Sequence, residues 1–368
     1  MKIEQIDAFQ VDYRYAEKGA YIMSGGRALE SFTSTIVKIS TDQGVVGFGE
    51  VCPLGSAYME AYAKGVPSGI QELGPALIGH DPCQIQVIND LMDSAMEGHN
   101  YVKSPIDVAC WDILGQAAGL PVCTMLGGRY VDRFPLYRAI SQHASEEMAD
   151  DIARFRSEGY RKFQLKAGGY PDEDIRRIRS ALEVLEPGDI LVADANRGWL
   201  LPQALRVVNA VVGENVYIEQ PCRTLEECLV VRNHSDLPMV LDEIVISAEA
   251  LVNAWGQRAL DILNIKFSRS GGLAKSKLLR DMCQAFGIIM TIEDCWGGDI
   301  TTATIAHLAG STRPEFLFTA TDFNSYVDLK VAPDAPRRET GKLAVPTAPG
   351  LGIHVDEKVL GDPVVSIR

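Results

Sequence analysis

Five short apolar runs of this chain each end in a lysine or an acidic residue and follow one another at a nearly constant interval. Their end residues are 23 to 28 residues apart, which is about the length of one strand, one helix and two loops. In a parallel β/α barrel every strand ends on the same face, so the five side chains would converge there. The runs are KFQLK ending at Lys166, ILVAD at Asp194, VYIE at Glu219, MVLD at Asp242 and ILNIK at Lys266.

The segment from about residue 126 to residue 344 continues this alternation of strand and helix. Helix-like stretches such as DEDIRRIRSALEVL lie between the apolar runs. Eight strand–helix units close naturally into a barrel, so we expect an α/β barrel here. Three further runs complete the eight strands: FPLYRA (134–139), IIMTI (288–292) and FLFT (316–319).

Residues 1–125 have a different pattern and predict a second, α+β domain. The first fifty residues alternate like antiparallel strands with a turn at residues 42–44, and helices follow them. In one of these helices we expect Ser104 as the N-cap and Pro105 at the first helical position. The tail, residues 345–368, contains proline and glycine and is expected to run back across this domain.

Two N-terminal segments, residues 15–31 and 52–62, carry glycine and aromatic residues without periodicity. Such loops are often lids or substrate-binding elements, although plain connectors have a similar composition. We interpret both as lids, and Tyr58 in the second segment is a candidate substrate contact.

Composition restricts the class of partner. The net charge of −14 argues against nucleic acid and against an anionic membrane surface. The N-terminus has no signal-peptide pattern, and no run approaches the roughly 18 apolar residues of a membrane helix. The eight cysteines show no C-x-x-C spacing, so we interpret them as reduced thiols. We therefore expect a cytoplasmic protein.

Asp194, Glu219 and Asp242 are candidate metal ligands. Three carboxylates on successive strand ends would repel one another without a cation between them. Their hard oxygen atoms suit Mg²⁺, or Mn²⁺, with room left for substrate oxygens. A single acid at a strand end is usually a helix cap or a loop ion pair, so the prediction depends on all three. Asn196 and Glu243 are expected to support these ligands.

Lys166 and Lys266 are the candidate acid and base. Their strands lie across the barrel from one another, with the three carboxylates between them, so the lysines would flank a bound substrate. Burial and a divalent ion would both lower the lysine pKa towards the range useful for proton transfer. Two unrelated salt-bridge lysines are the alternative.

Over essentially its whole length, the chain resembles the enolase superfamily, in the group of muconate cycloisomerase and mandelate racemase. The matching motifs are QLK (164–166), DAN (194–196), EQP (219–221), DE (242–243) and NIKFSRSGG (264–272). The resemblance implies a (β/α)7β modified TIM barrel under an α+β capping domain formed by the N-terminus and the tail. It also implies Mg²⁺ at the three carboxylates and two acid/base lysines, because enolase-superfamily sites generally combine such a base with Mg²⁺ at an enediolate.

Two positions depart from the pattern of that superfamily. Gln164 stands where many relatives have the first lysine of a K-x-K motif, which is thought to tune the pKa of its neighbour, here Lys166. The seventh strand reads IIMTIEDCW and contains no histidine, so the His–Asp dyad of mandelate-racemase-type sugar-acid dehydratases is missing.

Four further segments resemble relatives that act on proline derivatives, namely cis-3-hydroxy-L-proline dehydratases and 4-hydroxyproline betaine 2-epimerases. A betaine has a quaternary ammonium and favours an aromatic face, whereas a prolinium has N–H donors and favours a carboxylate. Asp322 follows the eighth strand where the betaine epimerases have tryptophan, which favours a secondary ammonium; a turn cap is its alternative role. Trp296 and Asp294 are further candidate substrate contacts. The segments are GEVCPLGSAY (49–58), GHNYVKSPID (98–107), EDCWGGD (293–299) and PGLGIHVDE (349–357).

The resemblance therefore predicts removal of a proton α to a carboxylate. The expected reaction is dehydration of cis-3-hydroxy-L-proline to Δ1-pyrroline-2-carboxylate by a hydro-lyase. The first alternative is a 2-epimerase or racemase of proline betaine or hydroxyproline betaine, and a lesser one is a dipeptide epimerase or cycloisomerase. The expected partners are a small-molecule amino-acid substrate and further copies of the chain, since relatives are commonly multimers.

Overall fold

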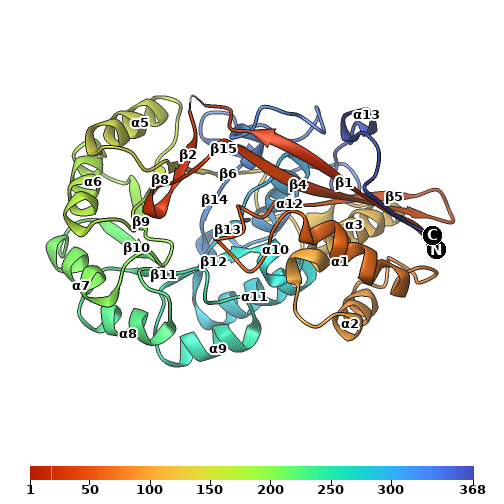
Figure 1. The fold of residues 1–368 in the computed structure, drawn as a ribbon, viewed down its shortest axis with the longest axis horizontal. Helices are drawn as coiled ribbons and strands as arrows, with labels where there is room; N and C mark the ends of the chain where they lie inside the picture. The colour runs from red at the N-terminus through yellow and green to blue at the C-terminus, as the bar shows by residue number, and fades with distance from the viewer. Residues whose placement is uncertain (18) are drawn as a thin grey trace.

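The computed structural model describes residues 1–17 and 19–368 and consists of a barrel beside a strand-rich capping part (Figure 1). The barrel sheet has eight strands in chain order, each paired in parallel with the next. This order confirms the expected α/β barrel. The strands are β7 (Tyr137–Ile140), β8 (Lys162–Lys166), β9 (Ile190–Asp194), β10 (Val216–Glu219), β11 (Met239–Leu241), β12 (Ile262–Lys266), β13 (Ile289–Glu293) and β14 (Leu317–Ala320).

A helical connection joins each barrel strand to the next, and these helices form the outer layer of the barrel in Figure 1. Eight strands with helical crossovers between them make the expected (β/α)7β arrangement. Each helix turns an apolar face inward, as Ile152 and Phe155 of the first helix show. The helices are α5 (Ser145–Ser157), α6 (Pro171–Glu183), α7 (Leu201–Ala210), α8 (Leu225–Asn233), α9 (Ala248–Gly256), the short α10 (Phe267–Ser270), α11 (Leu273–Phe286) and α12 (Asp299–Gly310).

The expected first barrel strand, residues 134–139, is in fact two strands. β6 (Arg133–Pro135) pairs antiparallel with β15 (Lys342–Ala344) and lies outside the barrel sheet, whereas β7 begins the barrel. Between them, the Leu136 amide donates to the carbonyl of Gly341 over 2.8 Å. Pro135 has no N–H for a sheet ladder, which favours the end of a strand at this position.

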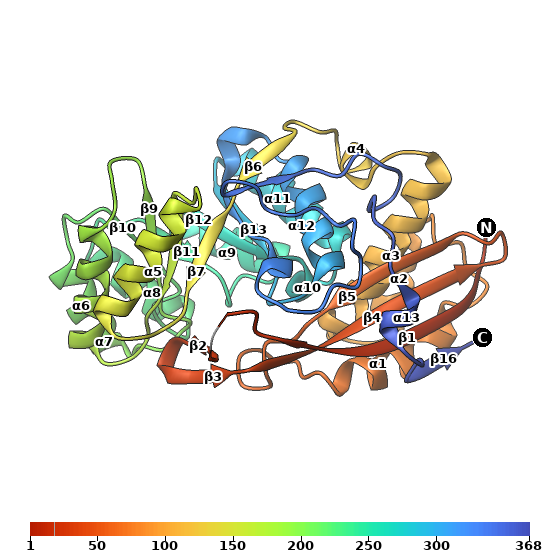
Figure 2. The same cartoon turned by 90° about the horizontal axis from the view of Figure 1, so that it is seen from above.

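The N-terminal strands form a four-stranded antiparallel sheet in the order β16-β1-β4-β5. Because the last strand pairs with the first, the tail returns to the N-terminal part as expected, and the two termini lie at the same end of the molecule in Figures 1 and 2. The predicted turn at residues 42–44 joins two of the strands, with Gly44 at a φ of 75°. The strands are β1 (Ile3–Arg14), β4 (Ser31–Thr41), β5 (Val46–Val51) and β16 (Val365–Ile367); the short α13 (Glu357–Leu360) precedes the last.

Helices pack against this sheet and enclose an apolar core of their own. The longest, α3 (Asn100–Ala118), corrects the expected helix start at Ser104, because it begins earlier and contains Pro105 in its interior. The side chains of Val102 and Ile106 are fully buried, and this packing compensates for the hydrogen bond that proline cannot make. The other helices are α1 (Gly65–Leu73), α2 (Ile85–Ala95) and α4 (Val122–Met125).

The two expected lid segments have different structures. Segment 15–31, apart from residue 18, which lies outside the described residues, contains a short hairpin of β2 (Tyr21–Met23) and β3 (Arg27–Leu29) instead of an irregular loop. Segment 52–62 has no regular helix or strand, as expected.

All eight cysteines are free thiols. In the described part of the chain, no helix combines the length and the apolar character that a membrane crossing requires.

Candidate active site

The five ionisable residues meet at one end of the barrel. Lys166, Asp194, Glu219 and Lys266 are the last residues of their strands, and Asp242 directly follows β11. Asp194 is paired in register with Lys166 on one side and with Glu219 on the other. All five residues are buried, with 6% exposure or less. The strand ends therefore bring together the side chains that the spacing singled out.

Each lysine is paired with one of the carboxylates. Lys166 Nζ donates to Asp194 Oδ2 over 2.6 Å, and Lys266 Nζ donates to Asp242 Oδ2 over 2.9 Å. Burial lowers the lysine pKa values, but the carboxylates outweigh burial, so the pKa of both lysines is raised. The expected lowering applies to lysines beside a divalent ion. A lowered lysine pKa would require a cation that takes up the charge of Asp194 and Asp242.

The three carboxylates have the chemistry of a hard-cation site. Burial raises the pKa of Glu219 well above its usual range, and the charges of Asp194 and Asp242 raise it further. For Asp242, burial raises the pKa, but Arg269 and Lys266 together lower it to about 2. Among the described residues, no group of three or more histidine, cysteine or acidic side chains is arranged to hold an ion as it stands. A hard cation would therefore have to replace the basic partners of these repelling carboxylates, whose oxygens are suitable ligands for it.

Tyr58, from the lid at residues 52–62, reaches the centre of this site. Its hydroxyl accepts hydrogen bonds from Lys266 Nζ at 2.7 Å and from Arg269 Nη2 at 3.0 Å. The same hydroxyl lies 3.4 Å from Asp242 Oδ2. Its backbone carbonyl accepts a hydrogen bond from Arg197. These hydrogen bonds hold the lid segment over Lys266.

The β2–β3 hairpin covers the site on the side of β9 (Figure 1). Ser24 Oγ lies 3.1 Å from the carbonyl oxygen of Asp194 and 2.9 Å from Asn196 Oδ1. The Gly26 amide donates to Gln142 Oε1 over 2.9 Å. Both predicted lid segments therefore contact residues at the strand ends.

Both lysines line one small cavity of about 20 Å³. This volume corresponds to about one water molecule. Trp296 forms part of the wall and stacks on Phe32, with ring centroids 4.3 Å apart. With both lid segments in this position, the cavity is too small for a five-membered ring. Other aromatic wall residues are Tyr21, Tyr137, Phe323 and Tyr326.

The structure does not bring Asp294 and Asp322 to the wall of this cavity. Asp294 Oδ1 accepts a hydrogen bond from the Ser268 amide at 3.2 Å, and burial raises the pKa of Asp294 to about 7. Burial also raises the pKa of Asp322, to about 6, although the nearby Arg138 opposes this shift. Contact of either carboxylate with a substrate ammonium stays a prediction, whereas Tyr58 and Trp296 already line the cavity.

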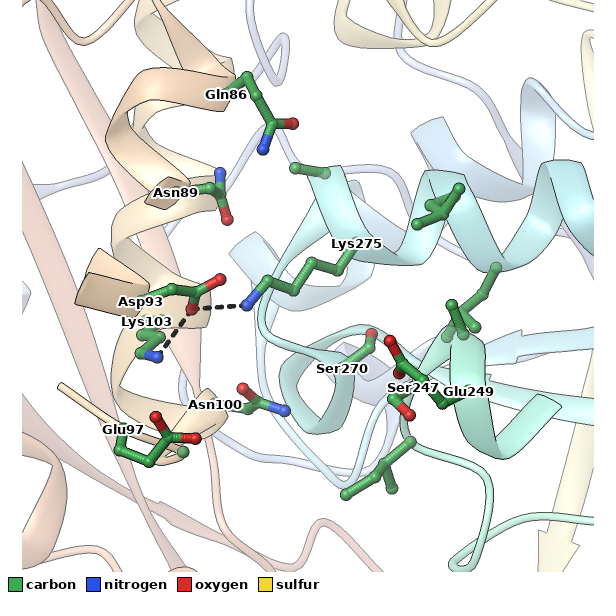
Figure 3. Close-up of a pocket in the computed structure, with 16 residues that line it drawn as sticks. Gln86, Asn89, Asp93, Glu97, Asn100, Lys103, Ser247, Glu249, Ser270 and Lys275 are labelled. Atoms are coloured by element: carbon green, nitrogen blue, oxygen red, sulfur yellow. Dashed lines mark hydrogen bonds and ion pairs between the residues drawn. The ribbon is translucent and has the colours of Figure 1, made fainter. Parts of the chain in front are cut away.

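A much larger cavity, of about 670 Å³, lies between capping helices α2 and α3 and barrel helices α9 and α11 (Figure 3). In it, Lys103 and Lys275 bond the same oxygen of Asp93, at 2.8 and 2.7 Å. None of the five strand-end residues lines this cavity. Convergent polar groups, and not size, therefore identify the active site.

Comparison with known families agrees with this geometry. Residues 147–359 match the family described as enolase C-terminal domain-like, and residues 16–127 match the N-terminal domain of mandelate racemase / muconate lactonizing enzyme. The chain belongs to the mandelate racemase/muconate lactonizing enzyme family of the enolase superfamily.

Several members of this family match over nearly their full length. A cis-3-hydroxy-L-proline dehydratase of Roseibium aggregatum is 54% identical, with 99% of each chain covered. An N-succinyl-L-Arg/Lys racemase of Bacillus cereus is 29% identical, with 99% of this chain and 98% of that one covered. A solved family member from Roseovarius nubinhibens has a TM-score of 0.96 and 39% identity, and the match covers 100% of this chain and 98% of that one. Another from that organism, complexed with magnesium, has a TM-score of 0.96 and 35% identity, with 100% of both chains covered.

In this family member, a polar layer lies beneath the carboxylates. Gln164, expected as a supporting residue, donates to Glu219 Oε2 over 2.9 Å. Asn264 donates to Glu219 Oε1 over 2.7 Å and also bonds Glu293. Asn264 and Glu293 were not predicted as site residues. Strand alternation was the signal available, because Asn264 lies two residues before Lys266 and so shares its face of the strand.

The other supporting residues, Asn196 and Glu243, contact each other. The Asn196 amide donates to Asp194 Oδ1 over 2.8 Å, and its side chain donates to Glu243 Oε1 over 3.1 Å. Asn196 has a φ of 44°, in the left-handed region that asparagine tolerates well. Burial, followed by the charge of Asp242, raises the pKa of Glu243 to about 7. Arg269, which donates to Asp242 Oδ1 over 2.6 Å, was also missed, and nothing in its spacing marks it.

Proposed function

We propose that this protein is a hydro-lyase that dehydrates cis-3-hydroxy-L-proline to Δ1-pyrroline-2-carboxylate. The observation that carries the proposal is the 54% identity to the Roseibium dehydratase over 99% of both chains. The site supports it, since two lysines from opposite strands line one cavity beside three buried carboxylates.

The metal of the proposed reaction is Mg²⁺, held by Asp194, Glu219 and Asp242. Their carboxylate oxygens are the hard ligands that Mg²⁺ prefers. The magnesium complex of a relative that is 35% identical supports this choice. When bound, the ion would withdraw electron density from the substrate carboxylate and so acidify the α-hydrogen.

Lys166 and Lys266 supply the proposed proton transfers. In cis-3-hydroxy-L-proline the hydroxyl lies on the carboxylate face of the ring, opposite the α-hydrogen, so the elimination is anti. One lysine takes the α-proton, and the other donates a proton to the departing hydroxyl. The C–H and C–O bonds break, a C=C bond forms, and water leaves. The enamine then tautomerises to the cyclic imine of Δ1-pyrroline-2-carboxylate.

Incubation of the purified protein with Mg²⁺ and cis-3-hydroxy-L-proline tests the proposal. We expect the pyrroline signal in NMR spectra to appear with loss of the hydroxyl group, and to depend on both lysines. The trans-3-hydroxy isomer is a matched control, because its hydroxyl and α-hydrogen lie on the same face. Absence of pyrroline with the cis isomer would refute the proposal.

The aromatic wall of the cavity favours a second candidate, 2-epimerisation of proline betaine or a hydroxyproline betaine. Tyr21, Trp296 and Tyr326 line the cavity beside the lysines, and a quaternary ammonium binds well against such faces. Deuterium that enters Cα from D₂O while the hydroxyl group is retained would support this reaction instead of dehydration.

We further propose a cytoplasmic location and a homo-oligomeric state, with a small amino acid as substrate and without nucleic-acid or membrane partners. The net charge of −14 supports the exclusion of anionic partners. Gel filtration with light scattering tests the oligomeric state.

A further inference from the structure

Glu50 of β5 is a buried carboxylate of the capping sheet that contacts the start of a barrel helix. Its residue exposure is 1%. Oε1 accepts from the Gly298 amide at 2.9 Å, and Oε2 accepts from the Thr301 amide at 2.9 Å and from Thr301 Oγ1 at 3.0 Å. Tyr13 Oη and Ser34 Oγ, from neighbouring capping strands, donate to Oε1 at 2.9 and 2.8 Å. One side chain thus joins the capping sheet to the N-terminus of α12, where the helix dipole favours a negative charge.

The start of α12 is continuous with the wall of the lysine cavity. Trp296 lies three residues before the first residue of the helix, and only Gly297 and Gly298 separate them. A Cβ on Gly298 would lie 2.4 Å from Tyr13 Oη, and a Cβ on Gly297 would lie 2.2 Å from Thr301 Oγ1. The backbone between the helix start and Trp296 is therefore short and closely packed, with no space for a side chain at either glycine.

The capping part also contacts the Trp296 ring directly. Phe32 stacks on it with a centroid distance of 4.3 Å and an interplanar angle of 24°, and the Tyr21 ring lies 4.9 Å away. The indole lines the cavity that holds Lys166 and Lys266. Ring contacts and the backbone anchor at Glu50 therefore act on the same wall of the site.

We propose that Glu50 is a positioning residue that fixes Trp296 as a wall of the lysine cavity and so couples the capping sheet to the active site. Glu50 does not touch the cavity itself and acts through the backbone of Gly298 and Thr301. Only the kinetic readout of this inference rests on the proposed dehydration. Glutamine at position 50 would direct an amide N–H at two or more donors, because each carboxylate oxygen accepts at least two hydrogen bonds.

A double-mutant cycle of Glu50→Gln and Trp296→Phe tests the proposal. We expect Glu50→Gln to lower kcat/KM by about tenfold, mainly through KM, and to lower it by less than about threefold in the Trp296→Phe background, because coupled residues are not additive. The emission of Trp296, taken as the difference between each protein and its Trp296→Phe counterpart, should also shift with Glu50→Gln.

Asp112→Asn is the matched control. Asp112 is also a buried carboxylate of the capping part that accepts from backbone amides, those of Phe48 on β5 at 3.0 Å and of Leu351 at 2.8 Å. It tests the same loss of charge without a direct hydrogen bond to the start of α12, so kcat/KM should change by less than about threefold, as expected for residues that do not share hydrogen-bond partners.

The proposal would be overturned if Glu50→Gln lowered kcat/KM by the same factor in the wild-type and in the Trp296→Phe background. It would also be overturned if Asp112→Asn lowered kcat/KM as much as Glu50→Gln does. If the wild-type protein does not dehydrate the substrate, only the proposed function fails, and an unchanged Trp296 emission in Glu50→Gln would then reject the coupling. If Glu50→Gln does not fold, Thr301→Val replaces it in the same cycle, because it removes one donor to Glu50. A smaller shift of Trp296 emission in the same direction supports the proposal, and no shift refutes it.

Discussion

The hydroxyl of Tyr58 lies 2.7 Å from Nζ of Lys266, so a lid residue of the capping part directly contacts a strand-end lysine of the barrel. The same hydroxyl accepts a second hydrogen bond, from Arg269 at 3.0 Å. In this arrangement the lid that covers the cavity therefore also supplies a hydrogen-bond partner to Lys266.

Tyr58→Phe should lower kcat/KM for dehydration by about 10- to 100-fold, since hydrogen bonds to charged groups contribute about 1.5–3 kcal/mol. The substitution removes only the hydroxyl and keeps the ring that covers the site. Tyr62→Phe is the control, because Tyr62 belongs to the same lid but is 53% exposed. Steady-state kinetics give kcat/KM for both variants. An equal loss of kcat/KM in Tyr58→Phe and Tyr62→Phe would contradict the role of Tyr58.

Lys166→Ala and Lys266→Ala should each lower kcat by about 10²–10⁴-fold, as expected for loss of a general acid or base. Both variants should remain folded, as circular dichroism would report. Lys275→Ala provides a matched control, since Lys275 forms an ion pair with Asp93 in the large cavity, which none of the five strand-end residues lines. Either active-site variant with near wild-type turnover would exclude that lysine from the chemistry.

Glu219→Gln should weaken Mg²⁺ binding by at least about tenfold, because it removes a charged oxygen from the proposed ligand set. Isothermal titration calorimetry with Mg²⁺ measures this without substrate. Glu226→Gln is the control, because Glu226 is exposed in the first turn of α8. Unchanged affinity in Glu219→Gln would remove Glu219 from the metal site. Chelation of the wild-type protein should abolish turnover, and added Mg²⁺ should restore it.

The burial of His307 makes the free energy of unfolding depend on pH. It is fully buried in α12, where Nδ1 accepts from the Cys123 amide at 3.1 Å and Nε2 donates to the Leu351 carbonyl at 3.0 Å. Burial lowers its pKa from 6.5 to about 4, partly opposed by the Leu351 carbonyl. Between these two values the unfolded chain binds a proton that the folded chain does not, so the contribution of His307 to stability is complete above about pH 6.5 and is lost as the pH falls towards 4. Buried carboxyls with raised pKa values, such as Asp294, act in the opposite direction.

The expected loss is about 3 kcal/mol over this window, given about 1.4 kcal/mol for each unit of pKa shift. Urea unfolding of the wild type and of His307→Gln at pH 7.5 and at pH 4.5 measures this contribution, as the difference between the pH-dependent changes of the two proteins. His307→Gln should be less stable at pH 7.5 but should depend less on pH, because it cannot take up a proton. The exposed His234→Gln should keep the full dependence. An equal pH dependence in His307→Gln would rule out this histidine as the cause.

The barrel and its strand-end residues were predictable because their pattern is local. Each run of about five apolar residues ends at the barrel face, so Lys166, Asp194 and Lys266 were identified by position alone. Other features depend on contacts that are distant in the chain. Pro105 lies inside a helix because the residues around it pack into the capping core, and local signals for a helix start do not contain that information.

Spacing and residue type along the chain were thus sufficient for the fold class, for the five ionisable strand ends and for the family resemblance, since eight repeated strand–helix units close naturally into a barrel. They were not sufficient for the partners of those side chains. That Arg269 neutralises Asp242 and that Asp322 stays outside the cavity wall depend on how different strand ends of the barrel pack together. That Tyr58 bonds Lys266 depends on the packing of the capping part over the barrel. Hydrogen bonds and burial between segments far apart in the chain have no periodic signature, so only the folded arrangement reveals them.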